Sequence, residues 1–400
     1  MSEKRRDKKG RILHNGEIQM PDGRYRFKYL GPNGKEIAIY SWRLVSTDIT
    51  PAGKKDSEPL RELEKQIQKD IFDNIDTRAS NITVLQLVKK YIATKKGVRR
   101  NTQNGYHTVL TLLENDSFGR KIIANVKKSD AKTWLIKLQE DDGRSYNSVR
   151  VVGGVLRPAF QLAVDDDFIR KNPFSFSLKD VIVNESLKRE ALSEDDEKKF
   201  LEFIKVDGVY KKYYEVIYIL FKTGMRISEF CGLTMDDINF DDHSINIDHQ
   251  LLKTSKVGYY IEKTKTKNGT RVIPMTDDVE ECFRTLIAKR KTPLKEPIVD
   301  GYSGFLFFNR ERSITHAYLW NQYFKRIVEK YNRLNKDSQI PKVTPHICRH
   351  TYCSNMAKSG INPKALQYLM GHSSISVTLN IYTHLNYNDI KEEVHRINNA

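Results

Sequence analysis

Residues 344–350 read TPHICRH, and this stretch brings two nitrogen-rich side chains to one side of an expected helix. Pro345 suits the first turn of a helix, because the N–H group that proline lacks would have no partner there. His346 and Arg349 are three residues apart, so a helix places them on the same face. The stretch therefore predicts a helix start that presents an imidazole and a guanidinium together.

The stretch TGMRISE at residues 223–229 follows an apolar helix pattern. Its glycine is typical of a helix end, since glycine adopts the left-handed backbone without steric cost. Arg226 then projects from the end of an element, and Glu229 lies one helical turn later. We expect Glu229 to orient either an arginine or His346.

A third stretch, LMGH at residues 369–372, places a histidine directly after a helix. Asn362-Pro363 predicts the start of that helix and Gly371 its end. His372 then projects from the helix terminus, as Arg226 does. Tyr382 follows ten residues later, in a polar neighbourhood of the sequence.

The stretch KTKTKNG at residues 263–269 crowds three lysines in front of a turn. Asn-Gly is the strongest two-residue hairpin signal, because both residues accept a positive φ. Strand-like runs flank it at 259–261 and 272–274. We therefore expect these two runs to pair with each other across Asn268-Gly269.

The charge of the chain points to a polyanionic partner. Lysine and arginine number 68 against 51 aspartate and glutamate, giving a net charge of +17 and a pI near 9.4. A protein this basic most often binds nucleic acid. The longest apolar run that we find, over 216–221, is far below the roughly 20 residues of a membrane-spanning helix, so no membrane span is expected.

Cysteine usage and the N-terminus favour a cytoplasmic protein. The four cysteines form no CxxC pair, which suits a reducing compartment. The N-terminus, MSEKRRDKKGR, carries charge where a secretory signal would be apolar.

The N-terminal region, residues 1–78, is expected to form a small sheet and a helix. Along 24–30 the side chains alternate strictly, with Tyr25, Phe27 and Tyr29 on one face. The opposite face carries the candidate DNA-binding residues, which are Arg24, Arg26 and Lys28. An ordinary solvated strand face is the alternative, and the basic run that precedes it weighs against that reading.

Residues 79–175 predict an all-α bundle of four helices, beginning near Thr83, Asn101, Ser129 and Ser145. This module is also basic, and one helix joint concentrates the further candidate DNA-binding residues Lys95, Lys96, Arg99 and Arg100. A solvated loop would look similar. Two basic modules in series suggest a protein that touches two stretches of duplex.

A polar linker is expected from Ser175 to Arg189, and residues 190–400 then form a mainly α, α+β segment. The chain is thus predicted to be multidomain. Its end offers a short apolar stripe at Ile390, Val394 and Ile397, from which we expect a C-terminal tail helix that docks on a neighbouring protomer.

Taken in chain order, the four stretches and Tyr382 supply Arg, Lys, His-x-x-Arg, His and Tyr. This order resembles the tyrosine recombinases of the phage integrase family, and most nearly the integrases of conjugative transposons. The resemblance spans the chain, with 1–78 similar to an arm-binding domain based on a three-stranded sheet, 79–175 to a core-binding domain and 190–400 to the catalytic domain. It implies a catalytic set of Arg226, Lys265, His346, Arg349, His372 and Tyr382. Lys263 and Lys267 remain alternatives for the lysine.

The chemistry of phosphoryl transfer agrees with these residue types. Two arginines can offer paired N–H donors to the non-bridging oxygens of a pentacovalent phosphorus. Tyr382 is the implied nucleophile, and with an ordinary pKa near 10 it needs a cationic site and a base.

The other implied roles concern protons. His346 would accept the phenol proton, Lys265 would protonate the departing 5′ oxygen, and His372 would bind the phosphate. Because a 3′-phosphotyrosine stores the bond energy, neither a metal nor another cofactor is implied.

The resemblance further implies integration and excision of a mobile element through a Holliday junction. The partners would be double-stranded DNA at core and arm sites, with a homo-tetramer acting on it. An excisionase and a DNA-bending host factor are further partners that the family suggests.

Three other interpretations remain at this point. A type IB-like topoisomerase would use the same chemistry without exchanging partners, and an architectural DNA-binding factor would lack cleavage. Zinc bound by His346, Cys348, His350 and Cys353 is the third, but structural zinc sites usually bring a second, separated ligand pair.

Overall fold

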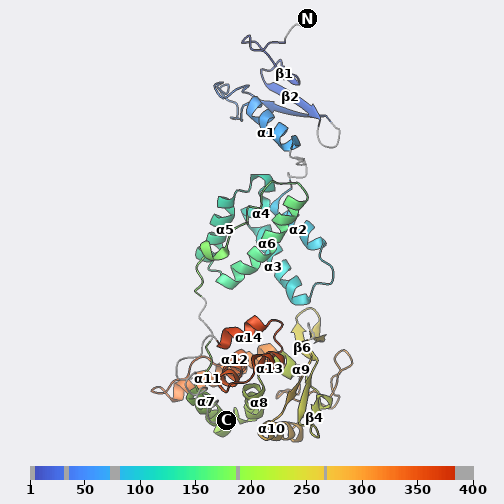
Figure 1. The fold of residues 1–400 in the computed structure, drawn as a ribbon, viewed down its shortest axis with the longest axis vertical. Helices are drawn as coiled ribbons and strands as arrows, with labels where there is room; N and C mark the ends of the chain where they lie inside the picture. The colour runs from blue at the N-terminus through green and yellow to red at the C-terminus, as the bar shows by residue number, and fades with distance from the viewer. Residues whose placement is uncertain (1–4, 31–35, 73–81, 186–189, 265–267, 383–400) are drawn as a thin grey trace. The chain divides into compact units, whose positions relative to one another are not determined.

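The computed structural model describes residues 5–30, 36–72, 82–185, 190–264 and 268–382, without the side chains of 69–72. It divides into two compact units, Met1–Leu187 and Lys188–Ala400 (Figure 1). Within the described ranges, no helix is both long enough and apolar enough to cross a membrane.

The N-terminal part contains the predicted three-stranded antiparallel sheet. Its strands are β1 (Glu17–Gln19), β2 (Tyr25–Leu30) and β3 (Glu36–Ser41), in that order, and helix α1 (Leu60–Phe72) packs on β2 and β3. Tyr25 and Phe27 are buried with Leu44 and Leu60, as the alternation predicts. Residues 31–35, between β2 and β3, lie outside the described residues.

The second part of the first unit is helical. Its elements are α2 (Val84–Ala93), α3 (Arg100–Asn115), α4 (Ser117–Arg120), α5 (Lys128–Glu140) and α6 (Tyr146–Asp165), with short 3-10 turns at Ile123–Asn125 and Leu178–Asp180. Thr83 and Ser145 cap α2 and α6 as predicted, each accepting a hydrogen bond from a first-turn amide. Four long helices therefore surround one apolar core.

The polar linker that we expected from Ser175 is shorter. Phe174 and Ile182 are buried in the bundle core, and Phe176 and Val181 pack against it. The apolar residues of this loop are spaced irregularly, with neither the period of a helix nor that of a strand. Because buried segments are predicted from such periods, the burial of this loop was not predicted.

Within the part of the chain that the structure describes, the second unit contains most of the helices and every strand besides β1, β2 and β3. The helices are α7 (Glu194–Val206), α8 (Tyr214–Thr223), α9 (Ile227–Gly232), α10 (Asp277–Ala288), α11 (Ala317–Leu334), α12 (Pro345–Lys358), α13 (Pro363–Met370) and α14 (Ile375–Tyr382), with 3-10 turns at Lys211–Tyr213 and Met235–Asp237. Helices α12, α13 and α14 pack against one another (Figure 1). The fold class predicted from the sequence is confirmed.

The predicted hairpin across Asn268-Gly269 is wrong. Strand β7 (Gly258–Lys263) pairs with β6 (His249–Thr254), whereas β8 (Arg271–Pro274) joins β5 (Ser244–Ile247) in a sheet with β4 (Ile238–Asn239). The hydroxyls of Thr264 and Thr270 meet at 2.6 Å, so the loop closes at its base while the strands diverge. Burial of Ile273 in the main core outweighs the local turn preference.

A buried carboxylate lies between α1 and the N-terminal sheet. Glu64 is 5% exposed, and its Oε1 has no hydrogen-bond partner. Burial, and then the negative charge of Glu17, raise the pKa of Glu64 to about 8. Glu17 itself is held by Arg61, with N–O distances of 3.0 and 3.1 Å.

We predict that this packing weakens as pH rises. An unfolded glutamate titrates near 4.3, so the stabilising contribution of protonated Glu64 is complete below about pH 4.5 and is lost toward pH 8. Amide hydrogen exchange of β2 and β3 in the full chain should therefore lose protection between pH 5 and pH 9. Glu64→Gln, which cannot ionise, should flatten that dependence, and an unchanged slope would contradict the assignment.

Candidate active site

Three arginines converge on the last carbonyl groups of helix α13. Arg271 donates through Nε to the carbonyl of Leu369 at 2.7 Å, and Arg226 donates through Nη2 to that of Gly371 at 3.2 Å. Arg349 donates through Nη2 to the carbonyl of Met370, which lies between them. Three consecutive carbonyls thus each accept a hydrogen bond from a guanidinium.

This arrangement follows from the physics of a helix end. The last carbonyls of a helix have no partner within the helix and carry a partial negative charge, which attracts cations. Gly371 has φ +60°, so the chain leaves the helix there and exposes these oxygens. The glycine that sequence analysis took as a helix end therefore also builds a cation-binding surface.

Glu229 joins two of the arginines. Its Oε1 accepts from Arg226 Nη1 at 2.7 Å and from Arg271 Nη1 at 3.2 Å. Its Oε2 accepts from the Arg226 amide and from Arg271 Nη2, both at 2.8 Å. Burial alone would raise the pKa of Glu229, but the hydrogen bond and charge of Arg271, with Arg226 and Arg349, lower it to about 2.

Arg349 is almost completely buried at the start of α12. Besides Met370, its guanidinium donates to the carbonyl of Gly224 at 2.8 Å, at the end of α8. Burial, followed by repulsion from Arg226, lowers the pKa of Arg349 to about 9. Among the described residues, Glu229 is the one carboxylate that pairs with this cluster, through Arg226 and Arg271, so the three arginines and Glu229 keep a formal charge of about +2.

His372 lies beside this cluster in a neutral form. Burial, then the charges of Arg349 and Arg226, lower its pKa to about 4. Its Nδ1 is 2.9 Å from the hydroxyl of Thr378, a buried residue of α14. Because one nitrogen of this neutral imidazole is hydrogen-bonded to Thr378, the other nitrogen can form a hydrogen bond with a ligand.

A cavity of about 310 Å³ opens beside these groups. His346 and Arg349 of α12 line it together, as their spacing predicts, and His372 lines it from the end of α13. Val377, Asn380 and Ile381 of α14 complete part of its wall. His346 is exposed, so the cavity has one open, imidazole-bearing edge.

Tyr382 does not line this cavity. Its hydroxyl donates to the carbonyl of Ile361 at 2.5 Å, and its ring packs with the small apolar cluster around Leu366 and Met370. The polar neighbourhood expected from the sequence is therefore wrong for the ring, because a neighbourhood in sequence does not report packing between helices. Tyr382 nevertheless ends the helix whose preceding residues line the cavity.

Lys265 and Lys267 lie outside the described residues, whereas Lys263 ends β7. The described end of their loop is attached to the site. Asn268 donates through Nδ2 to the carbonyl of His372 at 3.2 Å, and Gly269 accepts from Arg271 at 3.1 Å.

The potential zinc ligands of α12 are separated by packing. Cys348 is buried in the main core, whereas Cys353 belongs to the smaller cluster near α13. Two other groups in the described residues bring metal-binding atoms close together, and these are His14, Glu17 and Glu64, and Asp237, Asp248 and His249. In the second group His249 already contacts Asp248 and the Gly232 carbonyl.

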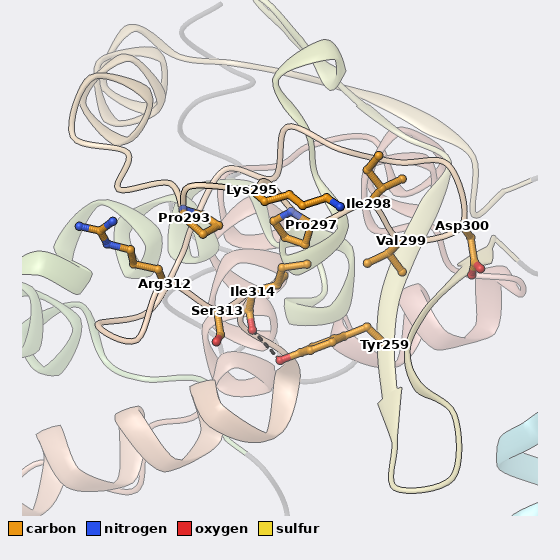
Figure 2. A pocket seen from close by; sticks show the side chains of 10 residues that line it. All are labelled: Tyr259, Pro293, Lys295, Pro297, Ile298, Val299, Asp300, Arg312, Ser313 and Ile314. Carbon is orange, nitrogen blue, oxygen red and sulfur yellow. Dashed lines mark hydrogen bonds between the residues drawn. The ribbon is translucent and has the colours of Figure 1, made fainter.

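A second hollow, of about 530 Å³, lies elsewhere in the same unit (Figure 2). Tyr259 of β7 crosses one side of it, and the Tyr259 hydroxyl donates to the carbonyl of Ile314 at 2.7 Å. Its ionisable lining side chains besides Tyr259 are Lys295, Asp300 and Arg312. None of the predicted catalytic residues that the structure describes lines this hollow.

The candidate DNA-binding residues of the sheet lie on its polar face. The Arg24 guanidinium is 5.3 Å from the ring centre of Tyr40 and 5.8 Å from that of Trp42, and it pairs with Asp22. Lys28 pairs with Glu36 at 2.8 Å. The Arg26 Nε is buried without a hydrogen-bond partner.

The basic joint of the bundle lies between α2 and α3. Lys95, Lys96 and Arg100 are exposed, and Arg99 is half-buried. The Lys95 ammonium lies 4.6 Å from the ring centre of Tyr91. These positive groups therefore face outward, where a phosphate backbone could reach them.

Sequence analysis missed Arg271. A signal was present, because Arg271 alternates with Ile273, so both lie on the buried face of β8 while Val272 and Pro274 are exposed. An arginine on an inward face needs a buried carboxylate partner.

Known proteins place the chain in a family. Residues 190–389 match the Phage integrase family, and residues 1–71 match the DNA binding domain of tn916 integrase. The transposase from transposon Tn1545 of Streptococcus pneumoniae is 46% identical over 398 residues, covering 100% of this chain and 98% of that protein. The transposase from Tn916 of Enterococcus faecalis is 45% identical with the same coverage.

Solved structures agree. The Tn1549 transposon integrase in complex with a circular intermediate DNA superposes with a TM-score of 0.74 at 41% identity, over 79% of this chain and 99% of that one. Fold and comparisons together define a site-specific DNA recombinase of the tyrosine type, an enzyme. The chain belongs to the phage integrase family, and its relatives include integrases of mobile transposons, as its motifs predicted.

We predict that Gly371→Ala destabilises the protein by more than the backbone strain of placing a side chain at a positive φ. Its new methyl carbon would lie 3.0 Å from Arg271 Nη1 and 3.1 Å from the Asn268 carbonyl oxygen. Gly258 is the matched control, since it also has a positive φ but no atom within 4 Å of the added carbon. Gly258→Ala should cost about 1–2 kcal/mol in urea unfolding of the full chain, and Gly371→Ala clearly more. Equal losses of unfolding free energy in the two variants would show that the neighbouring atoms move away from the new methyl group at no cost, which would contradict the prediction.

Proposed function

We propose that the arginine cluster binds the scissile phosphate of a DNA duplex. The observation that carries this proposal is three guanidiniums with one hydrogen-bonded carboxylate beside a cavity of about 310 Å³. Arg226, whose side chain is 40% exposed, and Arg349, which lines the cavity, would donate to the non-bridging oxygens. The surplus positive charge suits the extra negative charge of the transition state.

Tyr382 is the proposed nucleophile, and it must first leave the Ile361 carbonyl. Because Asn380 and Ile381 already line the cavity, a local change at the end of α14 would redirect the hydroxyl. The phenol oxygen would then attack phosphorus, forming a 3′-phosphotyrosine and releasing a free 5′ hydroxyl.

Proton transfers are assigned to the remaining site residues. His346, at the open edge of the cavity, would take the phenol proton. Lys265 would protonate the 5′ oxygen from the loop that Asn268 and Gly269 attach to the site. His372, neutral and held by Thr378, would donate to a phosphate oxygen. Glu229 orients Arg226.

We further propose that three regions share the DNA. Residues 1–78 would read arm sites with Arg24, Arg26 and Lys28, and residues 79–175 would grip core sites with the basic joint at 95–100. Residues 190–400 would cleave. One named relative is a transposase from a transposon and another is a transposon integrase solved in complex with a circular intermediate DNA, which supports double-stranded DNA as the partner.

Recombination of two duplexes presents four strands for cleavage, so a homo-tetramer is the proposed active assembly. Strand exchange through a Holliday junction would integrate and excise a mobile element. An excisionase and a DNA-bending host factor would join on the arm-site DNA. The tail helix proposed around Ile390 lies outside the described residues.

We predict that Tyr382→Phe abolishes covalent attachment to DNA. The wild-type chain should form an adduct with a nicked suicide duplex from the element's own ends, in the presence of EDTA. Tyr352→Phe is a matched control, since Tyr352 packs against the same small cluster, and it should retain the adduct. An adduct in Tyr382→Phe would assign the nucleophile elsewhere, with Tyr387 the next candidate, and peptide mapping would identify it.

We predict that Arg349→Lys lowers the single-turnover cleavage rate by about 10²–10³-fold, because lysine cannot reproduce the paired donors. DNA affinity, measured by fluorescence anisotropy, should stay within a few fold. Arg333→Lys on the exposed side of α11 controls for the substitution. A large loss of affinity would instead make Arg349 a binding residue.

A further inference from the structure

Arg271 is a charged side chain inside the protein. Its residue is 2% exposed, in the short strand β8. Transfer of a guanidinium from water to such a place is costly unless hydrogen bonds and an opposite charge compensate it. All three of its nitrogens donate, to Leu369, to Gly269 and, through two nitrogens, to Glu229.

The carboxylate of Glu229 is divided evenly between two arginines. Each of its oxygens accepts one hydrogen bond from Arg226 and one from Arg271. The two arginines differ in exposure, since the Arg226 side chain is 40% exposed and that of Arg271 is completely covered. Arg271 is thus the inner support of the carboxylate, and Arg226 is the outer group that can reach a ligand.

Arg271 also joins three separate segments of the site. It binds Leu369, three residues before His372, and Gly269, which ends the loop containing Lys265. Glu229 belongs to α9, which Arg226 caps. One guanidinium therefore connects α9, which contains Glu229 and is capped by Arg226, with the segment before His372 and with the described end of the loop at Gly269.

We propose that Arg271 is a positioning residue for strand cleavage, which holds the Glu229 carboxylate so that Arg226 meets the scissile phosphate in the reactive geometry. It does not itself touch DNA. This inference rests on the proposed function, because it assigns Arg271 a role through Arg226. A displacement of about 1 Å in a group that positions a substrate can cost on the order of 100-fold in rate.

The first test compares Arg271→Met with wild type. Single-turnover cleavage of the nicked suicide duplex should fall on the order of 100-fold, while DNA affinity stays within about threefold. Arg271→Lys keeps the positive charge but lacks the planar arrangement of N–H donors. Its cleavage rate should therefore lie between the rates of wild type and Arg271→Met. The matched control is Arg290→Met, because Arg290 is also mostly buried and binds Glu296 and the Phe305 carbonyl outside the site.

A double-mutant cycle with Glu229→Gln separates positioning from general stability. If Arg271 acts through Glu229, the double variant should cleave no more slowly than the poorer single variant. The pH profile provides a second reading. Arg226, Arg271 and Arg349 face Glu229, and His249 of β6 binds the same helix at Gly232. Without Arg271, buried Glu229 should protonate more easily, so cleavage by Arg271→Met should fall more steeply from pH 8 to pH 6 than wild type.

Three outcomes would overturn the inference. The first is a cleavage rate of Arg271→Met within threefold of wild type. The second is a double variant whose rate loss equals the product of the two single losses. The third is a pH profile of Arg271→Met that coincides with that of wild type. If Arg271→Met fails to fold in thermal melting, the same cycle and pH profile with Arg271→Lys decide the question. A wild-type chain that forms no adduct would overturn the proposed function itself, whereas normal adduct formation in wild type and Arg271→Met alike would overturn only the role of Arg271.

Discussion

The site depends on the carbonyl end of helix α13. Leu369, Met370 and Gly371 each offer a carbonyl oxygen to a different arginine, and the three arginines come from a strand and the starts of two helices. Hydrogen bonds to charged groups contribute about 1.5–3 kcal/mol each. The carbonyl oxygens of this helix end therefore stabilise three guanidinium groups that would otherwise repel one another. Glu229 offsets only part of that repulsion.

Local patterns in the sequence predicted most of the elements. The alternation over 24–30 predicted the buried aromatic face, and Thr83 and Ser145 correctly marked helix starts. These features depend on neighbours within a few residues. Strand pairing does not, and the turn at Asn268-Gly269 joins two strands that belong to different sheets. Core burial of Ile273 decides that pairing, and no local signal reports it.

The candidate site was predicted to a similar extent. Arg226, Arg349 and His372 meet at the end of α13, and His346 lies at the edge of the same cavity. The order of residue types was sufficient to select them, but it could not reveal how they are supported. Arg271 and the Tyr382 contact with Ile361 are interactions across 42 and 21 residues, so they became visible only in the folded chain.

The surplus charge of the arginine cluster has a practical consequence for handling the protein. A cavity with a formal charge of about +2 and convergent N–H donors should also attract small tetrahedral anions from the buffer. Sulfate or inorganic phosphate bound there would raise the melting temperature, because a ligand that binds only the folded state stabilises it. The same ion would compete with DNA, so solution conditions that favour storage would oppose activity.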